Sequence, residues 1–450
     1  MNPIRSILFL AATAWLAGCA APGEKRHTPA EMAAYRPADF VAPIASAAGE
    51  QVEATQAMEK IRAAMVLPPG GDPGELAPEA LHAVAFLNRE REAGLAILRN
   101  ALVDLDKKSA GYQRDVLSVA YSHYAVDVTT QVAQLLDKLS TPREFAIAAY
   151  TVLQADGSAS RREALAAQLH RQFADWTREP RLIALDHALS AEAATERHQR
   201  PPLADLLAAP LRPGYPVVYS LQRSDRRHFG VAIVRAADGR FVRNPDGSLF
   251  RVAQLAMALT NLPGTITNGN TPQGIYTVVG AGTATNRWIG PTPYLESKVP
   301  MEATIAEFEH APAQGEWSED RYDTFLPASW RGYFPIKEAW LAGLAGRNEM
   351  LMHGTTINSD YYRGTSYYPG TPSAGCMVAM EYWNKIDGGM LQSDQLSLGK
   401  AFTRDGLDQG YLVVVELDDR AAPVTLEEVT ADVAAAEAAF AARSAIRASN

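Results

Sequence analysis

The spacing of apolar residues changes once along this chain, near residues 201–215, and that change limits the folds open to it. Between about 51 and 200, as in PEALHAVAFLNREREAGLAILRNALVDL, apolar residues recur at three- and four-residue steps, which is typical of amphipathic helices. The segment PPLADLLAAPLRPGYP then interrupts the pattern with Pro and Gly. After it, YPVVYSLQ, HFGVAIVRAADGRFVRN, GIYTVVGAG and GYLVVVELDD indicate strands. We therefore predict an α+β chain, with an all-helical domain over 51–205 and a β-rich domain over 210–420.

Finer features follow from capping and turn residues. The helical domain should hold four to six helices, one of them opening at Thr141-Pro142 with Pro in the first turn. Asp238-Gly239 predicts a turn, and the apolar middle of 410–419 predicts a buried strand. Residues 421–450 are Ala-rich and predict a C-terminal helix. The irregular segment 281–345 predicts a lid or an insertion, although its tryptophans (Trp288, Trp317, Trp330 and Trp340) are equally suited to a core.

Composition excludes some functions. The chain has 450 residues and a net charge of −9, and no block of Lys or Arg stands out, so we expect no nucleic-acid partner. There is no Gly-rich phosphate loop and no Cys/His cluster in the sequence, so no cofactor and no metal site are predicted.

The N-terminus predicts export and lipid anchoring. An apolar run from Ile7 to Gly18 follows one Arg and ends in Leu-Ala-Gly-Cys, which resembles the lipobox of bacterial lipoproteins. The resemblance implies that residues 1–18 are a signal peptide and that Cys19 carries lipid and tethers the protein to a membrane. Ala20, which is not Asp, favours the outer membrane and a periplasmic location. Residues 19–50 are rich in Ala and Pro and predict a tether.

Cys376 is the one cysteine left after Cys19, so an internal disulfide is not expected. It follows the small residues Ser373-Ala374-Gly375, which permit a tight turn whose N–H groups can face a developing oxyanion. Upstream, His353 ends the strand-like segment NEMLM and can serve as the base that activates a thiol. Spacing alone leaves two interpretations of Cys376 and His353. They are either a nucleophile and its base or two unrelated residues.

The stretch from His353 to Met380 also resembles a known family. HGT (353–355) followed by SAGCMVAM (373–380) resembles the signature of the L,D-transpeptidase catalytic domain, the YkuD-like family. TPQGIYTV (271–278) and GYLVVVEL resemble two of its strands, in the family's order. The resemblance covers roughly 215–420 and implies that 210–420 is an L,D-transpeptidase-like catalytic domain.

The resemblance implies roles for individual residues. Cys376 matches the nucleophile that takes an acyl group from a peptidoglycan stem peptide, and His353 matches its base. A backbone carbonyl near Ser373 would orient His353, and the N–H groups of Gly375 and Cys376 would form the oxyanion hole. Gly354 would let the end of the strand pass close to the loop.

The chain departs from the family at three places. Ala374 replaces the usual second His of the motif, the interval from His353 to Cys376 is long, and no Arg follows the Cys. Arg363 could replace that Arg in holding a carboxylate, and Tyr362 and Thr355 join it as expected substrate-binding residues.

Three functions stay open on this evidence. The first is a transpeptidase, the second is a peptidoglycan hydrolase on the same scaffold, and the third is a catalytically silent wall-binding lipoprotein. The helical domain lies outside the resemblance and is expected to dock a protein partner, to position the site or to regulate it.

Overall fold

The β-rich half of the chain closes into a barrel. The computed structural model describes residues 25–72, 74–196 and 199–449. Eight strands follow one another in the order β5-β11-β2-β3-β4-β8-β7-β6, and β6 pairs back onto β5, while the short β1 extends the sheet beside β5. The strands are β1 Arg26–His27, β2 Val217–Gln222, β3 Gly230–Arg235, β4 Val252–Leu255, β5 Gly274–Gly282, β6 Tyr294–Lys298, β7 Met350–His353, β8 Met377–Ala379 and β11 Gly410–Glu416, with β9 Glu381–Trp383 and β10 Met390–Ser393 forming a separate hairpin.

The central strands are buried on both faces because their side chains alternate between two apolar cores. Along β11, Tyr411 and Val413 belong to one core, whereas Leu412 and Val414 belong to the other. This alternation follows from the two-residue repeat of a strand. It explains why the sequence of β11 is apolar throughout, as expected for 410–419.

Helices cover both cores. One core is shared with α14 (Asp394–Thr403) and α1 (Pro29–Ala34). The other core lies under the elements on the opposite face, which are α10 Leu203–Ala208, α11 Ile305–Glu309, α12 Glu319–Asp323, α13 Glu338–Leu344 and α15 Glu427–Ser449. Trp330 and Trp340 are buried in this second core. The segment 281–345, predicted as a lid or an insertion, therefore supplies β6, three helices and core side chains rather than a separate flap.

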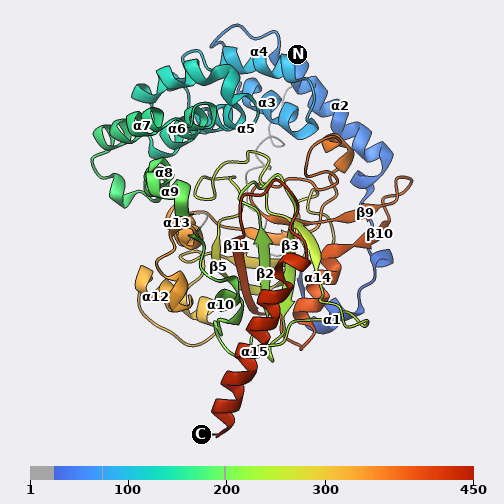
Figure 1. Ribbon diagram of the computed structural model, residues 1–450. Coiled ribbons are helices and arrows are strands. Elements are labelled where there is room, and N and C mark those ends of the chain that lie inside the picture. Colours follow the sequence, from blue (N-terminus) through green and yellow to red (C-terminus); the bar gives the residue numbers. More distant parts are fainter. Residues whose placement is uncertain (1–24, 73, 197–198, 450) are drawn as a thin grey trace.

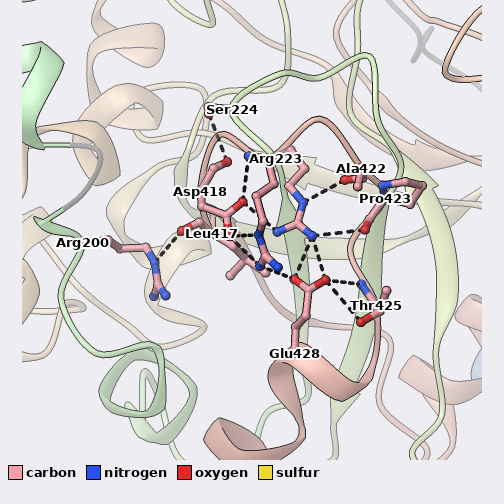
Figure 2. A network of polar contacts seen from close by, with 10 residues as sticks. Arg200, Arg223, Ser224, Leu417, Asp418, Ala422, Pro423, Thr425 and Glu428 are labelled. Atoms are coloured by element: carbon pink, nitrogen blue, oxygen red, sulfur yellow. Dashed lines mark hydrogen bonds and ion pairs between the residues drawn. The ribbon is translucent and has the colours of Figure 1, made fainter.

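A buried arginine fastens the C-terminal helix α15 to the barrel (Figure 2). The guanidinium of Arg223, which is fully buried, pairs with Asp418 at 2.9 Å and with Glu428 of α15 at 2.7 Å. It also donates hydrogen bonds to the carbonyl oxygens of Ala422 and Pro423. The guanidinium of Arg223 thus connects the ends of β2 and β11 to the start of α15.

The helical domain forms an arc on one side of the barrel (Figure 1). Its helices are α2 Ala47–Ala64, α3 Leu76–Leu87, α4 Arg91–Ala101, α5 Ala110–Leu135, α6 Pro142–Ala155, α7 Ala159–Gln172, α8 Pro180–Leu189 and α9 Ala191–Glu196. The helical domain therefore has more helices within the described residues than the four to six expected. The sequence did not reveal α8 and α9, because they are too short to show a clear apolar period. As predicted, α6 begins directly after Thr141 with Pro142 in its first turn.

The helical domain packs against loops of the barrel domain. Its apolar core continues into Leu262 and Ile266, into Trp288, and into Tyr361 and Tyr362. Phe86 of α3 is the central contact, with its ring 5.1 Å from that of Trp288 and 5.5 Å from that of Tyr361. The two domains therefore share one continuous core.

The segment that precedes the helical domain is folded where a tether was expected. Of the expected tether 19–50, residues 25–50 instead include β1, which pairs with β5, and α1, whose Met32 is completely buried. Short helical turns at Pro37–Asp39 and Pro43–Ala45 follow. The predicted signal peptide and Cys19 lie outside the described residues. No helix within the described part of the chain is both long and apolar enough to cross a membrane.

Candidate functional site

Strand register places His353 and Cys376 on the same face of the sheet. β7 and β8 run parallel, with Met352 opposite Met377 and His353 opposite Val378. Met352 and Met377 both point into the core shared with α14. Because side chains alternate along a strand, His353 and Cys376, each one position away, both project from the other face. The 23 positions between them are spanned by the loop that leaves β7 and returns to β8.

The imidazole of His353 is held in one tautomer. Its Nδ1 hydrogen-bonds the carbonyl oxygen of Gly354, and since a carbonyl only accepts, Nδ1 carries the proton. The neutral ring therefore presents Nε2 as an acceptor. Cys376 is the side chain that acts most strongly on His353, in the direction that stabilises the protonated ring. Burial alone would lower the pKa of His353, but the interactions with Cys376 outweigh it, so the pKa lies above its ordinary value.

The thiol of Cys376 is buried between two strands and an apolar wall. Its Sγ accepts a hydrogen bond from the backbone N–H of Leu351 at 3.3 Å, and the thiol donates one to the carbonyl oxygen of Glu349 at 3.5 Å. Ile289 and Tyr294 pack around the sulfur, and the residue is only 3% exposed. A hydrogen bond donated to sulfur stabilises a thiolate, which is the nucleophilic form.

A buried cation lies behind the nucleophile. Within the described residues the hydrogen bonds of the Arg347 guanidinium go to the carbonyl oxygens of Gly264, Gly269 and Asn270. Burial lowers the pKa of Arg347 to about 10, while the charge of Cys376 acts in the opposite direction, so the guanidinium stays charged at neutral pH. The positive charge favours the thiolate over the thiol.

Gly375 is a glycine because the turn leaves room for nothing else. Its φ of +125° is rarely adopted by other residues, and a Cβ there would lie 2.2 Å from Nη2 of Arg347. The sequence prediction of a tight turn before Cys376 agrees with this geometry.

Two details of the expected oxyanion hole differ in the structure. The hydroxyl of Ser373 accepts the Gly375 N–H at 2.9 Å and donates to the Cys376 carbonyl at 2.8 Å. The Gly375 N–H is thus used inside the turn and does not face a substrate, contrary to expectation. The carbonyl that orients His353 belongs to Gly354 and not to a residue near Ser373. Ser373 therefore shapes the turn.

The three expected substrate-binding residues occupy different environments. Arg363 is exposed and pairs with Asp360 at 2.6 Å. Tyr362 is 1% exposed and belongs to the core shared with the helical domain, so it packs rather than lines a site. Thr355 lines a cavity of about 280 Å³ that opens between the segments 355–360, 368–371 and 378–391.

Sequence reasoning missed two charged residues beside the pair. They are Arg347 and Glu381, whose carboxylate interacts with the charge of His353. Arg347 lies six positions before His353 and Glu381 five after Cys376. In the sequence neither differs from an ordinary surface charge, and only burial sets them apart.

A second cavity lies within the described part of the chain, away from the candidate pair. It is larger, about 710 Å³, and is lined by none of the predicted site residues. His310, at its wall, hydrogen-bonds the carbonyl of Gly410 at 2.8 Å and stacks on Tyr215, which is a packing role. Among the described residues no group of three or more His, Cys, Asp or Glu side chains could hold a metal ion.

Comparison with known proteins found no match among protein-family models, curated proteins or solved structures. What the geometry defines by itself is a mixed α+β protein whose strand barrel carries a buried thiol and a buried imidazole on the same face of two neighbouring strands.

Proposed function

We propose that this protein is an envelope lipoprotein of the L,D-transpeptidase type, which transfers acyl groups between peptidoglycan stem peptides through a thioester on Cys376. The single observation that carries the proposal is the placement of His353 and Cys376 on one face of the parallel strands β7 and β8, with Nδ1 of the imidazole tied to Gly354 and Cys376 acting on the pKa of the ring. A thiol whose proton is held by a fixed base is the requirement for nucleophilic catalysis by cysteine.

The chemistry has two steps. In the first, His353 Nε2 takes the thiol proton, the sulfur attacks a stem-peptide carbonyl, and the imidazolium gives its proton to the leaving amine. In the second, an amine attacks the thioester carbon, the C–S bond breaks, and the thiolate recovers a proton through His353. If water replaces the amine, the same intermediate gives hydrolysis.

The alternatives differ in a measurable way. A silent wall-binding protein also has a buried Cys, but it gains nothing from an imidazole fixed beside it. Alkylation of Cys376 at neutral pH should therefore slow by roughly 100-fold in His353→Ala, the usual scale of a general base. Equal rates in both proteins would favour the silent alternative.

The deciding experiment is muropeptide analysis of peptidoglycan treated with residues 20–450, beside Cys376→Ala and His353→Ala. New cross-links or exchanged stem termini with the unmutated protein alone would support transfer. Loss of existing links would identify a hydrolase. No change in any sample would overturn the enzymatic proposal.

Membrane attachment through Cys19 is the second part of the proposal. Cells fed a labelled fatty acid should incorporate label into the protein and not into Cys19→Ala. Fractionation should recover the labelled protein with the outer membrane. Label retained in Cys19→Ala would contradict the lipobox assignment.

A further inference from the structure

The cavity that begins at Thr355, two residues after His353, is lined by two acidic residues, Glu381 and Asp360. Glu381 follows Cys376 by five residues, begins β9 and lines the 280 Å³ cavity together with Thr355 and Thr371. That volume suits one amino-acid side chain rather than a glycan chain. Thr355 is two residues beyond His353, so the cavity begins where the strand carrying the base ends.

The carboxylate of Glu381 is fixed by hydrogen bonds from two segments of the chain. Oε1 accepts a hydrogen bond from the hydroxyl of Ser393 at 2.7 Å, and Oε2 accepts one from the N–H of Thr355 at 3.0 Å. Ser393 is also the N-cap of α14, so the carboxylate lies near the positive end of that helix. A Cβ on Gly354 would lie 2.0 Å from the Glu381 side chain, which shows how closely the carboxylate approaches the backbone next to His353.

The other charged groups around the cavity are paired. Lys385 forms an ion pair with Glu50 of α2, and Asp360 forms one with Arg363. A carboxylate can accept about four hydrogen bonds. Ser393 and Thr355 donate two and the Thr292 hydroxyl also acts on the carboxylate, which leaves capacity for one donor from the cavity. His353, on the far side of Gly354, is the titratable group whose charge acts on Glu381.

From this geometry we infer that the cavity receives the primary amine of the acyl acceptor and that Glu381 is its counter-ion and first proton acceptor. The inference rests on the proposed function and assigns its second substrate. Burial raises the pKa of Glu381 to about 7. A general acid or base is most effective when its pKa is close to the working pH, which is neutral here.

The proton balance of the step is complete. The acceptor enters as R–NH₃⁺ and gives one proton to Glu381, which becomes neutral. The amine attacks the thioester carbon, the C–S bond breaks, and the second proton passes through His353 to the departing thiolate. The products are an amide and the Cys376 thiol, and Glu381 later releases its proton to solvent.

The test separates charged from uncharged acceptors. The donor is an N-acetylated stem peptide carrying a thioester leaving group, so that thiol release reports acylation and mass spectrometry reports the amide. The acceptors are glycinamide, largely protonated at neutral pH, and methoxyamine, which is uncharged there. Glu381→Gln should slow transfer to glycinamide by about 100-fold and leave acylation and transfer to methoxyamine within about twofold.

Two further variants keep the test decisive. Asp246→Asn removes an exposed carboxylate that accepts a hydrogen bond from Ser248 in its own turn, outside the cavity wall, and should change neither acceptor. Leu391→Trp, at a wall residue that is 65% exposed, should obstruct both acceptors without preventing acylation, and it serves if Glu381→Gln does not fold.

The outcomes distinguish the two levels of the proposal. If the unmutated protein acylates and Glu381→Gln transfers to glycinamide at the unmutated rate, the assignment of Glu381 is wrong and the transferase survives. If Leu391→Trp leaves both acceptors unaffected, the cavity is not the acceptor site. If the unmutated protein releases no thiol, the proposed function fails, and this inference fails with it.

Discussion

At the scale of single residues, Arg347 makes the most specific prediction about the nucleophile. Its buried charge would favour ionisation of Cys376, whereas its hydrogen bonds to three carbonyls hold the 264–270 turn. Arg347→Met should lower the alkylation rate of Cys376 at pH 7 about tenfold, because without the nearby cation a smaller fraction of the thiol is ionised.

Arg347→Lys is the matched control for that experiment. It keeps the charge but loses the planar set of donors. Both variants should melt at lower temperature, because buried carbonyls lose partners. Only the Met variant should alkylate slowly. If Cys376 is alkylated equally slowly in Arg347→Lys and Arg347→Met, the role of Arg347 is to hold the turn and not to stabilise charge.

Gly354 is the second residue with a sharp expectation. Its missing Cβ makes room for Glu381, so Gly354→Ala should displace the carboxylate or the end of β7. We expect a loss of about 1–3 kcal/mol in the free energy of unfolding, as for overpacking of a close contact. Urea titration measures it, with Gly332→Ala as the control, because no atom lies within 4 Å of a Cβ there. Equal losses in the two variants would contradict the packing argument.

At the scale of elements, the attachment of α15 depends on the buried charge shown in Figure 2. Arg223→Met leaves Asp418 and Glu428 without their buried partner, which should cost about 3–5 kcal/mol and release α15. Limited proteolysis should then cut first between β11 and α15, at residues 417–426.

Arg420 provides the comparison for Arg223. It pairs with the same two carboxylates, but 55% of its side chain is exposed. Arg420→Met should therefore lower the free energy of unfolding by less than about 1 kcal/mol. If the two variants are equally stable, burial of the ion pair does not hold the helix.

At the scale of the whole molecule, the shared core links the helical domain to the nucleophile. Phe86 contacts Trp288, whose neighbour Ile289 packs on Cys376. Phe86→Ala should cost about 3–5 kcal/mol and also speed alkylation of Cys376, because the loop that covers the sulfur loosens.

Phe145→Ala separates those two effects. Phe145 is fully buried inside the helical domain, and its ring packs against Phe173 of the same domain, whereas the ring of Phe86 packs against Trp288 and Tyr361 of the barrel domain. It should be as destabilising as Phe86→Ala without changing the alkylation rate under native conditions. Similar alkylation in both variants would show that the helical domain does not control access to Cys376.

Much of the architecture could be predicted from short-range patterns. Strands occur within the segments 215–222, 228–244, 274–282 and 410–419 where they were expected, and so do the helix that begins at Pro142 and the C-terminal helix. Each is encoded by residues within about ten positions of one another. The expected tether over 19–50 was wrong for 25–50, because burial of Met32 depends on α14, more than 360 positions away.

The candidate site divides in the same way. The sequence by itself determined the residue types that chemistry requires, Cys376 with a small-residue turn and His353 at the end of a strand, because both features are local. Tertiary structure decided which groups surround them. Register placed the thiol and the imidazole on one face, and burial turned Arg347 and Glu381 from ordinary charges into neighbours of the site. A charge acquires such a role only when it is removed from water beside a partner, and that depends on contacts between segments that no local pattern encodes.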